Sequence, residues 1–197
     1  MNLFDIARVP LYSVMADNGT VIVFDTETTG LTDNDDVVQL AVVAMRKRRE
    51  LFSKAVYLKN QVPIDGTEAQ KVNGITDELL RNEGLNPEDV LSDFLSLIEK
   101  TISEDGMALL VAHNLSFDYR MIVNMMRKYG VADDFPEKAI GCCTKEFVKS
   151  LQLPKSVLPG NHLRNCIRVF QLDAKNSHDA LDDAKACWEL FNFLTKE

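Results

Sequence analysis

The sequence predicts an α/β sandwich built on a mixed sheet. Three strand-like apolar runs come first, and beyond residue 86 short apolar runs alternate with segments whose apolar residues recur at helical spacing. Strands first, followed by strands alternating with helices around one sheet, are typical of this fold class. With 197 residues, 46% hydrophobic and 26% charged, the chain can bury a single core, and its composition argues against wholesale disorder.

The N-terminal half contributes the first three strands. Residues 1–19 precede them, and their apolar content favours a packed arm over a frayed tail or a docking peptide, with residues 20–197 forming one domain. The acids within 32–36 lack the regular spacing and the closing Glu of a calcium loop, so we interpret this segment as a turn. The predicted strands are 20–26, 37–45 and 51–58.

The remainder of the chain alternates helices with two further strands, which makes five strands in all. Gly74 ends the first helical stretch, and Thr76 followed by two acids is typical of a helix N-cap. Asn86-Pro87 opens a longer amphipathic helix. The other predicted elements are helix 63–73, strand 107–112, helix 115–129, a strand ending at residue 142, a helical region over 144–171 and a final helix over 178–195.

The only dense basic run, Arg46–Arg49, joins the second and third predicted strands. We interpret it as a solvated hairpin turn, with a phosphate-contacting turn as the alternative. The net charge is −8 and the pI near 5.0, whereas nucleic-acid binders are normally basic, so any basic track must be local. This objection is weaker if four acids belong to one metal site, because those acids then account for half of the net charge.

The cysteines indicate a reducing compartment. Cys142, Cys143, Cys166 and Cys187 show no C-x-x-C spacing and no zinc-like histidine pairing, so we expect reduced, partly buried thiols. The sequence contains no signal-peptide pattern and no apolar run near eighteen residues. We therefore expect an intracellular, cytoplasmic protein that does not cross a membrane.

Two acids end the first predicted strand. Asp25 and Glu27 stand two positions apart, so their side chains point to the same face. Like charges held that close repel, and each carboxyl pKa rises unless a positive charge lies between them. A divalent cation provides that charge, and oxygen ligands suit Mg²⁺ or Mn²⁺. The alternative is that both are solvated turn residues at the strand end.

A third acid lies on a core-facing helix. In the predicted helix 115–129 the apolar residues form one stripe at about 100° per residue, and Asp118 lies close to its centre, opposite Arg120 and Arg127. A carboxylate in such a stripe is costly unless it is paired or metal-bound. The alternative is a buried salt bridge or a cap hydrogen bond, since Asp118 is near the helix start.

The last helix carries a fourth acid on the edge of its apolar face. Angular spacing of about 100° per residue puts Asp183 on that edge, Asp182 nearly opposite and Asp179 well off the face. His178 opens the predicted helix, with Ser177 as a possible N-cap. The helix dipole disfavours a charged imidazole there, although a capping or surface histidine is the alternative.

Three separated stretches carry a family resemblance. They are Asp25-Thr26-Glu27-Thr28-Thr29-Gly30, His113-Asn114-x-x-Phe117-Asp118 and His178-Asp179-Ala180-x-x-Asp183. These stretches resemble, in order, the three motifs of the DEDDh 3′→5′ exonucleases, a group that includes bacterial polymerase proofreading subunits and ribonuclease T. The resemblance runs from about residue 20 to the C-terminus. It implies a ribonuclease H-like fold, a mixed five-stranded sheet flanked by helices.

The resemblance also implies roles for single residues. Four acids would hold two Mg²⁺ or Mn²⁺ ions, and His178 would take a proton from the attacking water, a role that suits histidine near neutral pH. Two ions about 4 Å apart can activate the water and stabilise the leaving 3′ oxygen. The metal ligands are then Asp25, Glu27, Asp118 and Asp183, and the substrate contacts are Thr28, Gly30, Leu31, Asn114 and Phe117. Phe117 could equally be a core residue.

Two positions depart from the family pattern. Asn73 stands in the segment Val72–Thr76 where the family commonly has His, and the strand ending near residue 142 closes with Cys-Thr rather than Asp-Thr. Neither departure touches a motif acid. Both bear on the substrate rather than on the chemistry.

The leading functional hypothesis is a metal-dependent 3′→5′ exonuclease acting on single-stranded or frayed nucleic-acid ends, with DNA favoured over short or structured RNA. An endonuclease or resolvase would also use clustered acids, but His178 five residues before Asp183 favours the exonuclease. A catalytically silent binding subunit is the non-enzymatic alternative. A polymerase partner or a homodimer is compatible with the resemblance.

Overall fold

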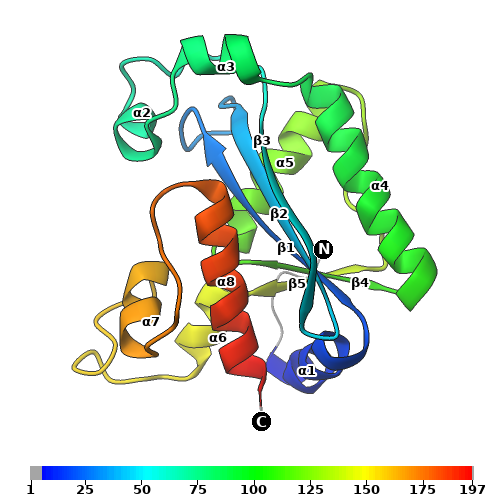
Figure 1. Ribbon diagram of the computed structural model, residues 1–197, viewed down its shortest axis with the longest axis vertical. Coiled ribbons are helices and arrows are strands. Elements are labelled where there is room, and N and C mark those ends of the chain that lie inside the picture. Colours follow the sequence, from blue (N-terminus) through cyan, green and yellow to red (C-terminus); the bar gives the residue numbers. More distant parts are fainter. Residues whose placement is uncertain (1–5, 197) are drawn as a thin grey trace.

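In this computed structural model, which describes residues 6–196, the chain forms a mixed five-stranded sheet with helices on both faces (Figure 1). The strands are β1 (Thr20–Thr28), β2 (Val37–Arg46), β3 (Arg49–Tyr57), β4 (Ala108–Ala112) and β5 (Ala139–Cys143). They are arranged in the order β3-β2-β1-β4-β5. The predicted α/β class and the five strands are confirmed.

The direction of each strand follows from its connection. β1, β2 and β3 pair antiparallel through short links, whereas β4 and β5 run parallel to β1 after longer helical crossovers. β1 is therefore the central strand, and it is buried on both faces. This explains why its first residues are a continuous apolar run rather than an alternating one.

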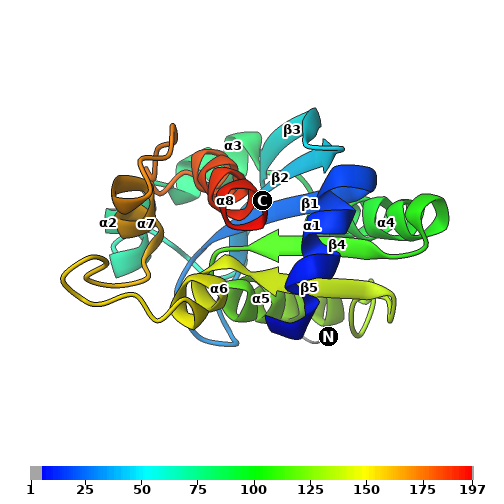
Figure 2. The same cartoon turned by 90° about the horizontal axis from the view of Figure 1, so that it is seen from below.

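Two helical layers cover the sheet. Ile22 and Phe24 of β1 pack in one core cluster with α4 (Pro87–Asp105) and α5 (Leu115–Lys128). Val21 and Val23 pack in a second cluster with α1 (Val9–Asn18) and α8 (Ala180–Thr195) on the opposite face (Figure 2). Even-numbered residues of β1 thus point to α5, and odd-numbered residues point to α8.

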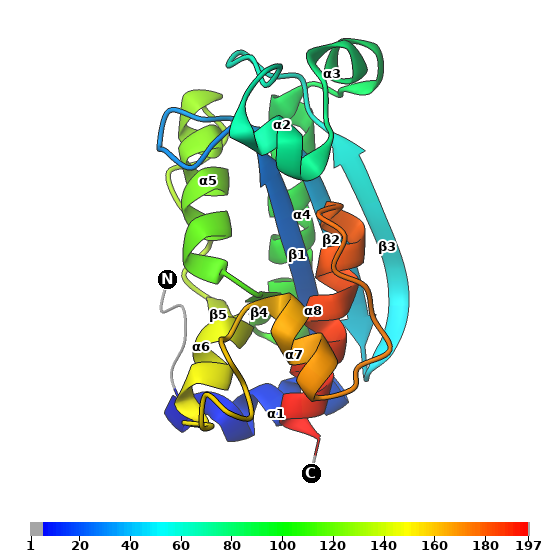
Figure 3. The same cartoon turned by 90° about the vertical axis from the view of Figure 1, so that its left-hand side faces the viewer.

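Shorter helices lie at the end of the sheet where β1 finishes. α2 (Glu68–Asn73) lies above the tip of β1, and α3 (Asp77–Glu83) lies above β3 at the same end of the sheet (Figure 3). The helix predicted over 63–73 begins five residues later than expected, because Gly66 has a φ of +80° and Thr67 is the N-cap. The Thr76 cap is confirmed, since its side chain accepts a hydrogen bond from the Leu79 N–H.

The return path to α8 is less helical than predicted. The region 144–171 contains two short helices, α6 (Thr144–Ser150) and α7 (Leu163–Val169), joined by an irregular connection with turns. Pro154 and Pro159 lie in the irregular part, where proline disfavours a continuous helix. This path packs α6 and α7 against the middle and C-terminal half of α8, through Ala186, Leu190 and Leu194 (Figure 3).

The N-terminal arm is only partly described, because residues 1–5 of the predicted segment 1–19 lie outside the described residues. Residues 6–8 form one 3₁₀ turn, and α1 follows. Tyr12 of α1 is fully buried, and its hydroxyl donates a hydrogen bond to the Gly141 carbonyl of β5 at 3.0 Å. This helix is therefore packed on the sheet.

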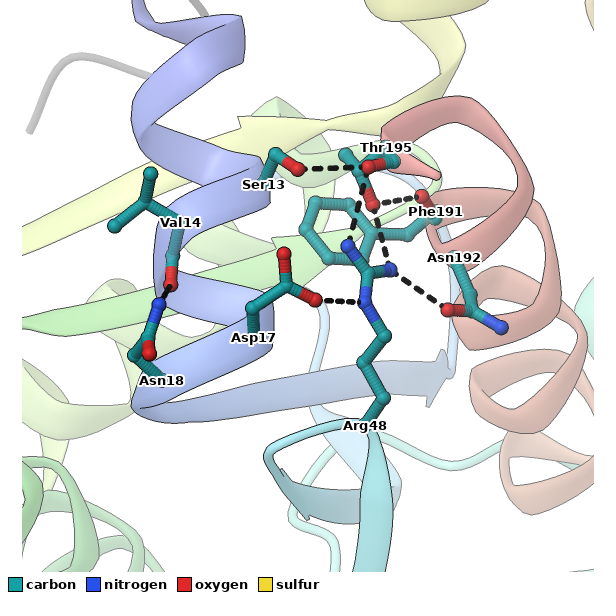
Figure 4. Close-up of polar contacts among 8 residues, drawn as sticks. All are labelled: Ser13, Val14, Asp17, Asn18, Arg48, Phe191, Asn192 and Thr195. Carbon is teal, nitrogen blue, oxygen red and sulfur yellow. Dashed lines mark hydrogen bonds and ion pairs between the residues drawn. The ribbon is translucent and has the colours of Figure 1, made fainter. Parts of the chain in front are cut away.

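The basic hairpin turn differs from the expectation of a solvated turn. Lys47 and Arg48 have φ values of 50° and 59°, the conformation of a tight two-residue hairpin turn. The Arg48 side chain is only 16% exposed, and it joins α1, the hairpin and α8 (Figure 4). It pairs with Asp17 and donates hydrogen bonds to Asn192 Oδ1 at 2.8 Å and to the Thr195 carbonyl at 3.1 Å.

Arg46 is also committed to the fold, through ion pairs with Asp105 at 3.2 Å and Glu104 at 3.6 Å. Two of the four basic residues of the turn thus hold structural contacts. The predicted hairpin turn is confirmed. The prediction that its side chains are solvated was wrong for Arg46 and Arg48, because their partners lie far away in the sequence.

All four cysteines are free thiols, and they are more deeply buried than predicted. Burial raises the pKa of the Cys142 and Cys187 thiols well above the ordinary value. Among the described helices, none is both long enough and apolar enough to cross a membrane.

Replacing Arg48 with Met should lower the free energy of unfolding by about 1–3 kcal/mol, the usual contribution of a hydrogen bond to a charged group. Met keeps much of the aliphatic stem and removes the guanidinium. The measurement is urea unfolding of both proteins. Arg49→Met, at the exposed next residue, is the control and should change stability by less than about 0.5 kcal/mol. Equal losses in the two variants would contradict a specific role for Arg48.

Candidate active site

The end of β1 brings two acids toward α8. Asp25 and Glu27 continue the odd-numbered positions of the strand, so they lie on the α8 side of the sheet. Both are half-buried. A register irregularity between Glu27 and Thr28 follows them, which ends the regular pairing with β2 directly after the second acid.

Asp118 reaches the same place from the other face. It lies in the first turn of α5, it is 3% exposed, and its Oδ1 accepts a hydrogen bond of 2.7 Å from the Thr26 hydroxyl. Thr26 is the even-numbered residue between Asp25 and Glu27, so it points to α5. Within residues 6–196, no cation forms a salt bridge with Asp118, so that alternative was wrong. Its partners are uncharged, namely the Thr26 hydroxyl and the backbone N–H groups of Thr26 and of Asp118 itself, the latter being a hydrogen bond within the first turn of the helix.

Asp183 is the buried acid of α8. It is 7% exposed, and it accepts hydrogen bonds from Asn176 Nδ2 at 2.7 Å and from the Ser177 N–H at 3.1 Å. The neighbouring Asp182 is half-buried and accepts a hydrogen bond from the Ser177 hydroxyl at 2.8 Å. The helical register thus directs Asp183, and not Asp182, into the acid cluster.

The start of α8 corrects one expectation. The helix begins at Ala180, and Asp179 is its N-cap, with the side chain accepting hydrogen bonds from the backbone N–H groups of the first turn. Ser177 is therefore not the cap, and His178 precedes the helix. Gln39 of β2 fixes this start, since its amide donates to Asp179 at 3.1 Å and accepts from the Ala180 N–H at 3.1 Å.

His178 lies at the open edge of the acid cluster. It is exposed, and its φ of +59° is uncommon for a residue with a side chain. Ligand-capable atoms of Glu27, His178 and Asp183 all lie within 4.8 Å of one another. The backbone strain at His178 thus coincides with the place where an imidazole meets two carboxylates, as strain often does at functional sites.

Burial and mutual repulsion disfavour ionisation of these acids. Burial first, and then the charges of Asp118, Asp183 and Glu27, raise the pKa of Asp25 well above its ordinary value. Burial raises the pKa of Glu27 to about 8 and that of Asp118 to about 7. The pKa of Asp183 is raised by burial too, and its hydrogen bonds partly offset the effect.

The donor set fits hard divalent cations. Carboxylate oxygens are the ligands that Mg²⁺ and Mn²⁺ prefer, and the hydrogen bonds that hold these acids come from uncharged groups. The negative charge of the cluster is therefore left for a cation to balance. Asp25, Glu27, Asp118 and Asp183 are the residues that could hold it, with His178 in reach of Glu27 and Asp183.

Asn73, the departure from the family pattern, contacts the cluster. It ends α2, and its side chain forms a hydrogen bond with Glu27 that lowers the pKa of that carboxyl against the effect of burial. Its Oδ1 accepts from the Ile75 N–H at 3.0 Å, which leaves the amide N–H₂ group for Glu27. Gly74 follows with a φ of +71°, a conformation that lets the chain leave the helix beside the acids.

The predicted substrate contacts differ in their exposure. Leu31 is 77% exposed, which leaves it free to contact a ligand, whereas Thr28 is buried and donates a hydrogen bond to the Gly30 carbonyl at 2.6 Å. Packing alone accounts for a glycine at position 30, because a Cβ there would lie 2.6 Å from the Asp35 carboxylate. Asn114 lies directly before α5 and lines a cavity beside the acids.

Phe117 is half-buried, so it is partly a core residue. The Arg120 guanidinium lies 5.5 Å from the centre of its ring and donates a hydrogen bond to the Leu31 carbonyl at 3.0 Å. Arg120 also pairs with Asp33, so it fixes the loop after β1 against α5. Arg120 thus contacts both the ring of Phe117 and the backbone of Leu31.

A cavity of about 360 Å³ adjoins the acid cluster. Some of the residues that line it were predicted site residues from the sequence, and others were not. Its lining includes the acids Asp25 and Asp183 with His178, the motif residues His113 and Asn114, and the residues not predicted, Lys145, His162, Leu163, Arg164 and Asn176. The unpredicted residues come from α6, α7 and the segment before α8, and no periodic pattern marks them.

The comparisons with known proteins agree with this architecture. The profile of the exonuclease family matches residues 22–191, and the chain belongs to this family. The family resemblance indicated by the sequence motifs is thereby confirmed. The chain is 30% identical over 184 residues to DNA polymerase III subunit epsilon of Treponema pallidum (strain Nichols), a match that covers 87% of this chain and 74% of that protein.

A second relative is much longer than this chain. DNA polymerase III PolC-type of Caldanaerobacter subterraneus subsp. tengcongensis is 27% identical over 177 residues, covering 88% of this chain but 11% of that protein. Among solved structures, Escherichia coli exonuclease I in complex with a dT13 oligonucleotide superposes with a TM-score of 0.70 at 18% identity, over 89% of this chain and 41% of that one. This likeness confirms the ribonuclease H-like fold.

Raising the pH should destabilise the metal-free protein. Glu27 has a pKa of about 8 in the fold and an ordinary value of 4.5, so between these values it is protonated when folded and ionised when unfolded. The free energy of unfolding should fall as the pH rises from about 7 to about 8, where His113, with a pKa lowered to about 4, is neutral in both states. Thermal melts in EDTA test this.

Mg²⁺ should reverse the effect, and the rise in melting temperature that it causes should grow with pH because the cation competes with protons for the same oxygens. Glu27→Gln is the control and should reduce the pH dependence of the metal-free protein, although Asp25 and Asp118, whose pKa values are also raised, still contribute to it. A Mg²⁺ effect that is the same at pH 7 and pH 8 would contradict binding at these acids.

Proposed function

We propose that this chain is a metal-dependent 3′→5′ exonuclease that hydrolyses phosphodiester bonds at DNA 3′ ends and releases nucleoside 5′-monophosphates. The observation that carries the proposal is the gathering of Asp25, Glu27 and Asp183, with Asp118 from the other face and His178 at the edge. Membership of the exonuclease family supports the reaction class.

Two Mg²⁺ or Mn²⁺ ions, held by Asp25, Glu27, Asp118 and Asp183, would activate the attacking water and balance charge on the leaving 3′ oxygen. His178 is the proposed general base. It is exposed and precedes α8, so its ring can reach a water beside the acids without disturbing the helix. Asn176 and Thr26 hold Asp183 and Asp118 in place through the hydrogen bonds described above.

The exposed side chain of Leu31, whose backbone Arg120 holds beside Phe117, supports recognition of a chain end. A terminal base can pack against the exposed Leu31, and Arg120 fixes the loop that carries it. Base-to-apolar contacts of this kind tolerate any sequence. Single-stranded or frayed ends therefore suit the site better than an intact duplex.

A role beside a DNA polymerase is supported by the names of the relatives, a polymerase III epsilon subunit and PolC-type polymerases. We propose that the chain, with residues 20–197 as its exonuclease unit and 1–19 as an arm, works with a polymerase inside the cell. The chain spans 74% of the epsilon relative but about a tenth of the PolC-type one. A homodimer is the competing arrangement, and size-exclusion chromatography with and without a polymerase distinguishes them.

The function is tested with matched DNA and RNA oligonucleotides, single- and double-stranded, blocked at either the 3′ or the 5′ end. The expected result is release of mononucleotides from single-stranded DNA in Mg²⁺ or Mn²⁺, stopped by EDTA and by the 3′ block. Faster release from RNA would make the chain an exoribonuclease. Internal cuts would favour an endonuclease, and no release with either metal would favour a catalytically silent binding subunit.

Asp183→Asn should lower kcat by at least about 100-fold, because a cation loses a charged ligand. Asp182→Asn is the matched control on the next position of α8, and it should retain kcat within about threefold since its side chain faces away from the cluster. Initial rates on a 3′-labelled oligonucleotide give both values. The reverse order of effects would mean that Asp182, rather than Asp183, serves the reaction.

His178→Ala should lower kcat by roughly 10²–10⁴, the usual contribution of a general base. The rise in melting temperature caused by Mg²⁺ should persist in this variant. If that rise disappears together with activity, His178 is a metal ligand, which its position within 4.8 Å of the oxygens of Glu27 and Asp183 would also permit.

A further inference from the structure

The cavity beside the acids has a basic lining, which we define as Lys145, His162 and Arg164. In a chain with a net charge of −8, these side chains share one cavity with Asp25 and Asp183. Among the described residues, Lys145 and Arg164 form no salt bridge, since neither lies within ion-pair distance of a carboxylate. Two cationic groups beside the proposed reaction centre are thus left without a protein anion.

Several other basic residues of the described chain form ion pairs. Arg48 pairs with Asp17, Arg120 with Asp33 and Lys128 with the buried Asp36. On the same short helix as Lys145, one turn further on, Lys149 pairs with Glu146. Lys145 and Arg164 differ from these residues because their charges are not used in an ion pair within the described part of the chain.

The basic lining is held in place by a buried histidine. His113 has both ring nitrogens occupied, with Nδ1 2.9 Å from the Thr144 hydroxyl and Nε2 2.9 Å from the Asn161 carbonyl. Asn161 Nδ2 in turn donates to the Lys145 carbonyl at 3.3 Å. These contacts tie the segment that carries His162 and Arg164 to the start of α6, where Lys145 stands.

Lys145 also points toward the reaction side of the cavity. Its Nζ donates a hydrogen bond of 3.3 Å to Oδ1 of Asn114, the residue directly before α5, which carries Asp118. The contact is long, and a lysine ammonium has three donor hydrogens, so two remain for a ligand. Arg164 is exposed at the start of α7, and its guanidinium can bind two oxygens of one phosphate.

We infer that Lys145 and Arg164 bind the backbone phosphate that adjoins the scissile one. This inference rests on the proposed function. A nucleotide at a 3′ end has a free hydroxyl, so the only phosphate next to the scissile phosphate lies on its 5′ side. The acids and their cations serve the scissile phosphate, and the basic lining of the same cavity is suited to the next one. A dinucleotide without a 5′ phosphate lacks this group.

The test uses two single-stranded DNA oligonucleotides that differ in one linkage. One has phosphates throughout, and the other has an uncharged methylphosphonate at the second linkage from the 3′ end. Binding is measured by fluorescence anisotropy in Ca²⁺, and cleavage is measured in Mg²⁺. Lys145→Gln and Arg164→Gln should each weaken binding of the all-phosphate strand about tenfold, a typical loss for one phosphate contact. Each should also lower the slope of log affinity against log salt concentration by about 1.

On the methylphosphonate strand the same variants should cause no further loss, since the contact is already absent. Lys149→Gln, on the exposed side of α6, is the matched control and should bind both strands as the unchanged protein does. Equal losses of affinity for both strands would overturn the inference. The two side chains would then not contact this phosphate, and Lys145 would act only through Asn114. If the unchanged protein binds the strands as predicted but releases no nucleotides, the proposed function fails and the phosphate contact stands.

Discussion

The structure depends on carboxylates that are crowded together, partly out of water, and held by uncharged donors. Thr26 donates to Asp118, Asn176 and the Ser177 N–H donate to Asp183, and Asn73 contacts Glu27. A cationic partner at these places would neutralise the acids and leave them inert. Neutral donors instead fix the position of each oxygen and leave the charge unbalanced. Burial therefore raises the pKa of each acid, and repulsion by the neighbouring acids raises the pKa of Asp25 and Glu27 further.

The two-faced central strand makes this crowding possible. β1 is covered by α5 on one face and α8 on the other, so its alternating side chains meet a different helix at each step. Thr26 can therefore orient Asp118 on one face while Asp25 and Glu27 face Asp183 on the other. A strand with one solvated face could not bring helices from both sides to one end. The site is thus a consequence of the layer architecture as much as of the motif residues.

The sequence alone predicts the helices and strands that are defined by a local pattern of apolar residues. It does not predict a helix start or a side-chain contact that depends on a residue far away in the chain. The strands and α5 could be predicted from apolar periodicity, and Asp118 stands out because it interrupts a core-facing stripe. The start of α8 could not, since Ser177 and Asp179 are equally good caps locally and Gln39, 140 residues away, selects Asp179. Lys145 and Arg164 carry no periodic signal, and they meet only because His113 and Asn161 join separate segments.

The buried cysteines offer a way to follow movement of the helix that carries Asp183. Cys187 stands one turn after that residue, is fully buried, and has its Sγ 3.5 Å from the Thr144 hydroxyl. A thiol in such a place can be alkylated only during transient local opening. The alkylation rate of Cys187, followed by mass spectrometry, therefore reports the free energy needed to lift α8 from the sheet, and no engineered label is required.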